Sequence, residues 1–391
     1  MPSSTQMTEA DANSEISLKP PLPDAEPQTV TLRSKNASLL PAPEANVAAT
    51  LLPAMKADTN LVLDEPLDTT FTENLSTIQD IYSTWYDEPE RIDVRAPLAD
   101  SQSTSISNHT ATFFSGGVDS FYTLLKHEDE IDALVYVHGF DVDLNDTSLR
   151  RQISGMLYEV GDHFGKTVIE VETDLRDFSE GRAAWGQYHG AALATVSHTL
   201  ETNFDIFIPS SYTYAHLFPW GSHPLLDPLW STRSTKFAHD GCEANRVQKC
   251  AKIVDHPIAL NSLRVCWRNP ESVYNCGRCE KCMRTMINLM AVGGLEDCST
   301  FDASLDLSRL SKMRIQDKNT RAFVKENLSS IQRNGSHPEI ARALESALSP
   351  PSSYERTLQV TRSKVSNLLR ATGIRDHVAN FVSKVGRFMQ K

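Results

Sequence analysis

The stretch ATFFSGGVDSFYTLLKH at residues 111–127 decides the fold. Residues 111–114 are mostly apolar, as in a buried strand, and residues 120–127 have the composition of a helix. The hexapeptide SGGVDS at 115–120 joins the two. Its backbone N–H groups would therefore lie at the start of a helix, where anions bind well. Two adjacent glycines let an oxyanion approach the backbone without a Cβ in the way. We therefore expect a strand–loop–helix unit that holds a phosphate-like group.

The alternation of strands and helices continues along the chain. Further strands are predicted at 133–138, 167–172, 205–209 and 236–239, and helices at 149–164, 185–202, 243–254 and 281–290. Such alternation predicts an α/β fold with a doubly wound parallel sheet, and an α+β fold is the alternative. In doubly wound sheets, ligands bind beyond the carboxyl ends of the strands.

The two ends of the chain differ from its centre. Residues 1–60 contain much Pro, Ser, Ala and Thr but no aromatic residue, so we expect a disordered tail. Residues 61–108 are predicted to form a small N-terminal element and a linker, with a helix over 71–86 and a short strand at 91–95. Residues 301–391 are predicted to be a helical C-terminal extension. Its last part, 375–391, is a basic amphipathic helix that either caps its own protein or contacts a partner or an anionic membrane.

Four of the seven cysteines have the spacing C-x9-C-x2-C-x2-C, namely Cys266, Cys276, Cys279 and Cys282. Four thiolates at this spacing can close a tetrahedral Zn²⁺ site that has a structural role. Gly277 allows a tight turn between two ligands, and Arg278, Lys281 and Arg284 would offset the negative charge. An iron–sulfur cluster is one alternative. Disulfides are another, although the cysteine count is odd and no secretory signal opens the chain.

The loop at 115–120 resembles the pyrophosphate loop of the PP-loop ATP pyrophosphatase superfamily, whose members adenylate a substrate oxygen and release pyrophosphate. Together with the four cysteines it resembles the 7-cyano-7-deazaguanine synthase family, which uses ATP and ammonia to turn a deazaguanine carboxylate into a nitrile. The likeness covers roughly residues 110–294. The sequence differs from the family pattern at two places. The spacing between the first two cysteines is longer here, and residues 218–252 do not match the base-recognition segments of the family. It implies an ATP-binding domain of the HUP type at residues 109–300.

The resemblance also implies binding residues. The β- and γ-phosphates of ATP would be held by the loop residues Ser115, Gly116, Gly117, Val118, Asp119 and Ser120. Within this loop Asp119 would either hold Mg²⁺ or orient the loop. The adenine would lie near His138 and Gly139, at the end of the second strand. Alternatively, His138 is a strand-end histidine whose ring is satisfied within the protein.

Catalytic roles are implied for Asp119 and for three residues near the predicted helix at 243–254. Arg246 or Lys249 would clamp phosphate, and Glu243 would orient them or bind Mg²⁺. Alternatively, Glu243, Arg246 and Lys249 form a solvated face of ion pairs, because they recur every three residues.

Two further features leave alternatives open. His216, His223 and Asp227 share a loop with Trp220 and Trp230, which either stack on a flat substrate or form a lid that packs on itself. A nucleophilic role for Cys242 would require a base that the sequence cannot place.

We thus expect a cytoplasmic ATP-, Mg²⁺- and Zn²⁺-dependent ligase or synthase that acts on a small molecule, with ammonia as a candidate nucleophile. The net charge of −12 argues against a nucleic-acid substrate. No apolar run has the length of a membrane helix. A tRNA sulfur-transfer enzyme of the same superfamily and a non-catalytic nucleotide-binding scaffold are the other hypotheses.

Overall fold

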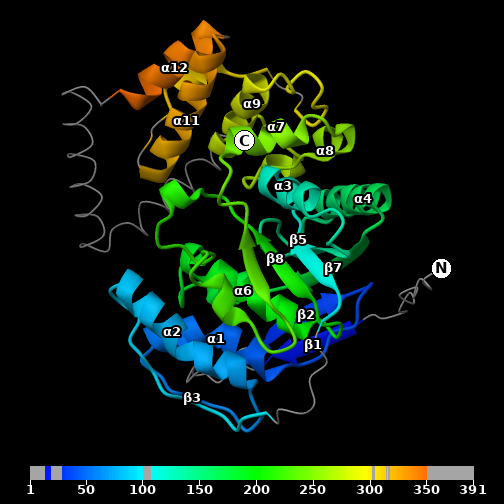
Figure 1. Ribbon diagram of the computed structural model, residues 1–391, viewed down its shortest axis with the longest axis vertical. Coiled ribbons are helices and arrows are strands. Elements are labelled where there is room, and N and C mark those ends of the chain that lie inside the picture. Colours follow the sequence, from blue (N-terminus) through cyan, green and yellow to red (C-terminus); the bar gives the residue numbers. More distant parts are fainter. Residues whose placement is uncertain are drawn as a thin grey trace, which may run out of the picture.

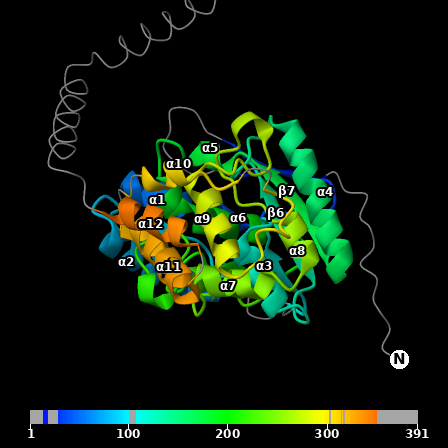
Figure 2. The same cartoon turned by 90° about the horizontal axis from the view of Figure 1, so that it is seen from above.

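A computed structural model of the chain describes residues 14–18, 29–99, 107–301, 304–313, 315, 318–335 and 337–349. Its centre is a seven-stranded sheet with helices on both faces (Figure 1 and Figure 2). The strands of this sheet are β1 Ser14–Leu18, β2 Val30–Ser34, β5 Thr110–Phe113, β6 Ala133–His138, β7 Thr167–Thr173, β8 Asp205–Pro209 and β9 Phe237–Asp240. The predicted α/β class is confirmed, with a sheet that is mostly parallel.

The strand order is β1-β2-β7-β6-β5-β8-β9, and within the parallel part from β5 to β9 the direction across the sheet reverses once. The parallel part starts at β5, continues outward through β6 and β7, and then crosses back to β8 and β9. The loops that follow β5 and β8 therefore diverge at the carboxyl edge and leave a crevice there, the usual place for a ligand in such sheets. All five strands of the parallel part were predicted to within one or two residues.

Two hydrophobic cores lie on opposite faces of the sheet. The α-helices are α1 Pro43–Lys56, α2 Thr69–Trp85, α3 Val118–Lys126, α4 Thr147–Phe164, α5 Leu175–Ser179, α6 Trp185–Thr199, α7 Arg246–Ile253, α8 Pro257–Ser262, α9 Glu280–Ala291, α10 Leu307–Ser311, α11 Lys318–Asn334 and α12 Pro338–Leu348. One core contains α1, α2 and α6, and the other contains α3, α4, α7 and α8 (Figure 1). Along β6, Val135 and Val137 face the first core while Leu134 and Tyr136 face the second. Strand β6 is buried over its whole length for this reason.

The N-terminal segment corrects the sequence prediction. Strand β2 pairs antiparallel with β7, and β1 pairs antiparallel with β2, so two strands extend the sheet at one edge. Helix α1 begins at Pro43 and is apolar on most sides, and it packs against α6 within the first core. A helix that is apolar all round belongs in a core. The prediction of disorder is wrong for residues 14–18 and 29–60, and the rest of 1–60 lies outside the described residues.

Residues 61–99 belong to the same core. Helix α2 begins after Asp68, whose carboxylate accepts the N–H of Phe71 at 3.2 Å and caps the helix. The same carboxylate binds Arg233 Nε at 2.8 Å, in the segment before β9. The predicted strand at 91–95 is reduced to β4 Val94–Arg95, which pairs in parallel with β3 Leu61–Val62.

Helices α10, α11 and α12 form a third cluster together with α9. The predicted helical extension is thus present between residues 307 and 348, and the amphipathic segment 375–391 lies outside the described residues. Throughout the described ranges, no helix combines the length and the apolar character that a membrane span requires.

Packing of α1 can be tested by mutation. Leu51 is fully buried in α1, so Leu51→Ala should lower the free energy of unfolding by about 2–5 kcal/mol, the usual cost of a core cavity. Leu40 is 50 % exposed in the same segment, and Leu40→Ala should cost less than about 0.5 kcal/mol. Urea unfolding followed by tryptophan fluorescence measures both. Equal effects would contradict a folded, packed N-terminal segment.

Candidate functional site

The loop between β5 and α3 has a backbone shape that requires glycine. Gly116 has φ of +71°, and a Cβ there would lie 2.7 Å from Met156 Cε. The loop is anchored because the N–H of Arg264 donates to the carbonyl of Gly116 at 2.7 Å. Helix α3 starts directly after Gly117, and its first N–H groups have no partner within the helix. The predicted strand–loop–helix unit is therefore present.

A cavity of about 230 Å³ opens between the loops that follow β5 and β8. Its polar wall contains Ser115, the segment from Gly117 to Ser120, and Ser210 to Tyr212 after β8. Its apolar wall includes Val135 to Val137 and Phe140, at the end of β6. The cavity thus occupies the carboxyl edge at the point where the strand order reverses.

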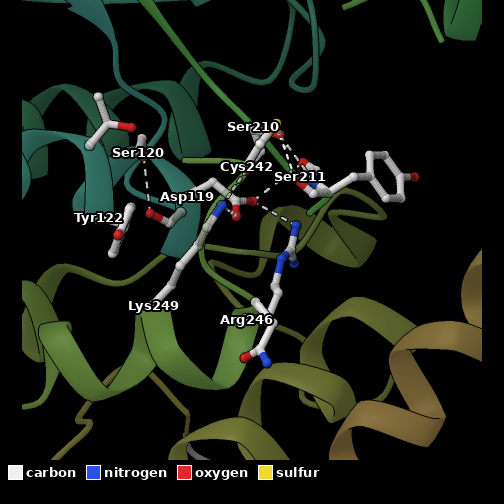
Figure 3. A network of polar contacts seen from close by, with 12 residues as sticks. Asp119, Ser120, Tyr122, Ser210, Ser211, Cys242, Arg246 and Lys249 are labelled. Carbon is white, nitrogen blue, oxygen red and sulfur yellow. Dashed lines mark hydrogen bonds and ion pairs between the residues drawn. The ribbon is translucent and has the colours of Figure 1, made fainter. Parts of the chain in front are cut away.

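A buried ion cluster lies beside this cavity (Figure 3). The Asp119 carboxylate, in the first turn of α3, binds Arg246 Nη2 at 2.6 Å and Lys249 Nζ at 3.1 Å, both from α7. Ser211 Oγ donates to the same carboxylate at 3.3 Å, and Lys249 also donates to the carbonyl of Ser210. Both cations are almost completely buried. The structure therefore brings together three of the four residues predicted to be catalytic.

The charges in this cluster do not balance. Burial opposes ionisation of Asp119, but the nearby positive charges of Arg246 and Lys249 lower its pKa to about 2. Lys281, in the first turn of α9, lines the same cavity. Its pKa is lowered by burial and also by Arg246, and no hydrogen bond or ion pair holds its ammonium group among the described residues. Around this cavity, the carboxylates of Asp119 and Asp141 accompany three cations, Arg246, Lys249 and Lys281.

Some buried polar atoms at the cavity have no hydrogen-bond partner among the described residues. They include Nε of Arg246 and the phenol oxygen of Tyr136. A buried polar group without a partner costs about 1–3 kcal/mol, so ligands or water usually satisfy it. Together with the excess positive charge, these atoms indicate a site for an anionic, polar ligand.

The aromatic wall of the cavity is closely packed. Phe218 lies edge-on to Tyr212 with ring centroids 4.6 Å apart, and Trp220 lies 5.4 Å from Phe218. The loop packs so closely on α6 that a Cβ at Gly190 would lie 1.9 Å from the carbonyl of Gly221.

Of the loop residues singled out from the sequence, Trp220 and His223 line the cavity. Trp230 is instead fully buried.

Glu243 does not belong to the ion cluster. Helix α7 begins at Arg246, later than predicted, because Asn245 and Gln248 form a capping box there. Glu243 therefore precedes the helix, and its carboxylate binds Lys126 Nζ at 2.7 Å and the Tyr122 hydroxyl at 2.9 Å. The expectation of one face shared by Glu243, Arg246 and Lys249 is wrong.

His138 also has another environment. Its Nε2 lies 2.8 Å from Glu170 Oε1, and Arg150 Nε donates to its Nδ1 at 3.3 Å. It lines a separate polar cavity between β7 and α4, which agrees with the alternative of a satisfied strand-end histidine. Gly139 was expected to lie near the adenine. In the structure, glycine is required there because a Cβ would lie 2.0 Å from the carbonyl of Thr173.

The four cysteines predicted to bind metal come together. The sulfur atoms of Cys266, Cys276, Cys279 and Cys282 all lie within 4.8 Å of one another and could hold a metal ion such as zinc. The backbone N–H of Cys279 donates to Cys276 Sγ at 3.3 Å, and that of Cys282 donates to Cys279 Sγ at 3.4 Å. Gly277 has φ of +61°, as the tight turn requires. None of the seven cysteines forms a disulfide in this structure.

Sequence reasoning missed two parts of the site. Lys281 was assigned to the charge balance of the cysteines, but its side chain lines the cavity. Ser210 and Ser211 were not named, although they directly follow a predicted strand. The rule that ligands bind beyond the carboxyl ends of parallel strands could have found them.

The chain was compared with models of protein families, with curated proteins and with solved structures, and none of the three comparisons found a match.

Proposed function

We propose that this protein binds ATP at the loop of residues 115–120 and adenylates a small molecule, with release of pyrophosphate. The observation that carries the proposal is the cluster of Asp119, Arg246, Lys249 and Lys281 at the start of α3. A polyphosphate supplies the negative charge that this cluster lacks. The helix N-terminus adds donors for the same oxygens.

The positive groups suit a pyrophosphate leaving group. Negative charge grows on this group as the bond to the α-phosphate breaks, and fixed donors in a site with little water stabilise it most at that stage. Lys281 and Arg246 line the cavity and are held there by α9 and α7. Both would act on phosphate oxygens without a rearrangement of the backbone.

Asp119 acts in this proposal as an orienting residue. Its two carboxylate oxygens already bind Arg246 and Lys249, so a Mg²⁺ ion on Asp119 would have to share these oxygens with two buried cations. Of the two roles considered for Asp119, orientation of the loop agrees better with these contacts. A Mg²⁺ ion that accompanies ATP would then be held chiefly by the phosphates and water.

The remaining cavity is left for the adenine and an acceptor. Val137 and Phe140 offer an apolar surface near the end of β6, and Trp220 and Phe218 offer aromatic surface on the other side. Flat rings bind well to such surfaces. The leading acceptor remains a 7-deazaguanine-like carboxylate with ammonia as nucleophile. We further propose that the four cysteines hold a structural Zn²⁺, because four thiolates leave no open coordination position.

Loss of one cation tests the proposal. Arg246→Ala and Lys249→Ala should each weaken ATP binding. The kcat for pyrophosphate release, measured with a panel of carboxylate acceptors that includes 7-carboxy-7-deazaguanine, should fall by roughly ten- to a thousand-fold, the range for a lost charge-stabilising donor. ATP binding is measured by isothermal titration calorimetry, and pyrophosphate by a coupled assay.

Glu243→Ala is the matched control, since this carboxylate lies close in sequence but pairs with Lys126 outside the cavity. It should bind ATP and turn over as the wild type does. If all three variants bind ATP equally well, or if the wild type does not bind ATP, the proposed site is wrong.

Metal binding is tested by Cys279→Ser. The wild type should contain one zinc per chain by mass spectrometry of the metal, and the variant should lose it together with a clear drop in Tm, because metal binding contributes directly to folding. Cys298→Ser removes a buried thiol outside the group and should keep the metal. Iron and sulfide in place of zinc would favour the sulfur-transfer hypothesis.

A further inference from the structure

The cavity of the proposed ATP site is lined by a second set of polar side chains, which the binding of phosphate does not use. This histidine group consists of His189, Ser222, His223 and His239. His189 is on α6, His239 is in β9, and the other two residues precede η2 Asp227–Trp230. Three separate segments of the chain therefore bring imidazole rings to one cavity.

A buried carboxylate holds His239 in place. His239 Nδ1 lies 2.6 Å from Asp227 Oδ2, and Asp227 is completely buried. The same carboxylate accepts the Ser222 hydroxyl at 2.7 Å and the N–H of His223 at 3.2 Å. Among the described residues His239 is the only ion-pair partner of Asp227, and a buried carboxylate is stable only beside a cation.

The His239 ring is therefore charged at neutral pH. Burial opposes a positive charge on the ring, but Asp227, and to a lesser extent Cys242, outweigh this effect and raise the pKa of His239 to about 9. In the sheet, His239 is in register with Ile208 of β8, two residues before Ser210 in the polar wall of the cavity. The positive ring thus lies on the strand next to the loop that reaches the ion cluster.

The other two imidazoles are neutral, and they carry their hydrogens on different atoms. Burial lowers the pKa of both His189 and His223. His189 Nδ1 lies 3.2 Å from the carbonyl of Trp185, which can only accept, so Nδ1 carries the hydrogen and Nε2 is an acceptor. His223 Nδ1 instead accepts the N–H of Leu225 at 3.0 Å, so its Nε2 is a donor. The group thus offers one acceptor, one donor and one positive charge.

Positive charge lines the cavity in two parts. Among the described residues, the cations in its wall are Arg246 and Lys281, from α7 and α9, and His239 from β9. The first two are assigned to the phosphates of ATP in the proposed function. His239 lies instead beside Ser222, whose Oγ is 3.4 Å from its Nδ1. A second anionic group, from a molecule other than ATP, would match this second charge.

Aromatic side chains border the histidine group. The His189 ring lies 5.5 Å from Trp220, and the His223 ring lies edge-on to Trp85 at 4.8 Å. Trp220 packs so closely on α6 that a Cβ at Gly186 would lie 2.7 Å from its ring. Such a surface favours a flat ligand.

We propose that the histidine group is the acceptor subsite, and that it takes a flat heterocyclic carboxylic acid whose carboxylate is bound by the His239 imidazolium. The inference rests on the proposed function, in which such an acceptor is adenylated. His189 Nε2 accepts an N–H of the heterocycle, and His223 Nε2 donates to a ring nitrogen or carbonyl. Asp227 is a positioning residue, because it contacts His239 and not the acceptor.

This assignment also gives a role to the segment that differs most from the family pattern. His223 and His239 both lie within residues 218–252, which do not match the base-recognition segments of the 7-cyano-7-deazaguanine synthase family. The acceptor is thus recognised by residues that belong to this chain's own pattern.

The bound carboxylate is the group that attacks ATP. One of its oxygens stays on the imidazolium while the other forms a bond to the α-phosphorus. The bond from this phosphorus to the bridging oxygen breaks, and pyrophosphate leaves with the electron pair. The carboxylate carries its full charge before this step, so His239 contributes mainly to binding of the acceptor. Loss of His239 should therefore raise KM more than it lowers kcat.

Discrimination between an acid and its amide tests the subsite. The probes are 7-carboxy-7-deazaguanine, nicotinate and indole-3-carboxylate, each paired with its carboxamide. Isothermal titration calorimetry at pH 7, with and without ATP, should show that the wild type binds at least one acid about ten times more tightly than its amide. His239→Gln removes the charge and should reduce this preference to less than about twofold. With the preferred acid, this variant should show a KM for pyrophosphate release at least about tenfold higher and a kcat within about threefold.

His216→Gln is the matched control, since this histidine follows the same strand β8 but lies outside the cavity and pairs with Glu326 at 3.3 Å. It should keep the preference for the acid. His239→Gln leaves Asp227 buried without a cation, which destabilises the fold. The double variant with Asp227→Asn and His239→Gln removes both charges together, and it decides if the single variant does not fold.

The proposal is overturned if the wild type binds none of the acids, or if the acid and its amide bind equally well. A preference that survives the loss of His239 would also overturn it, as would a fall in kcat without a rise in KM. ATP should bind equally well to the wild type and to all these variants. Failure of ATP to bind to the wild type would overturn the proposed function instead, and the titrations without ATP would still decide the subsite.

Discussion

The ion pairs of Asp119 with Arg246 and Lys249 are the constraint on which the site depends. They connect the first turn of α3 to α7, more than a hundred residues later in the chain, and Ser211 joins them from the loop after β8. Removal of one partner from a buried ion pair costs about 3–5 kcal/mol, because a buried charge is left unpaired. The two helices and the loop are therefore held as one unit, and this unit defines the polar end of the cavity.

The C-terminal helix α11 packs against the same cluster. Phe323 of α11 packs against Arg246, 5.7 Å from the ring centroid, and against Arg284, 4.0 Å away. Burial and the charge of Arg246 lower the pKa of Arg284 to about 10, although Arg284 also pairs with Glu280 at 3.2 Å. An aromatic face offers partial compensation to cations. An anionic ligand would offer these cations much more compensation, which agrees with the proposed binding of a polyphosphate.

The sequence predicted the parts that depend on local pattern. The strands from β5 to β9, the glycine loop and the four cysteines were recognisable because period, glycine conformation and ligand spacing are local properties. The buried N-terminal helix was missed because its alanine-rich composition resembles that of a disordered tail, and only its packing on α6 makes it a core element. Glu243 was misplaced because the capping box at Asn245 starts α7 later than the charge pattern indicates. Lys281 and the contact between Asp227 and His239 depend on tertiary structure alone.

The cysteine group and the cavity are different sites, but helix α9 contributes residues to both. Cys279 is the N-cap of α9, and its sulfur accepts the N–H of Cys282. Lys281 lies between these two positions, in the first turn of the same helix. A metal held by the four thiolates would therefore fix the direction in which the Lys281 ammonium enters the cavity. If the four thiolates hold a metal and the cavity binds a phosphate as proposed, the metal would also help to position the Lys281 ammonium, because the metal ligands and the cation share one helical turn.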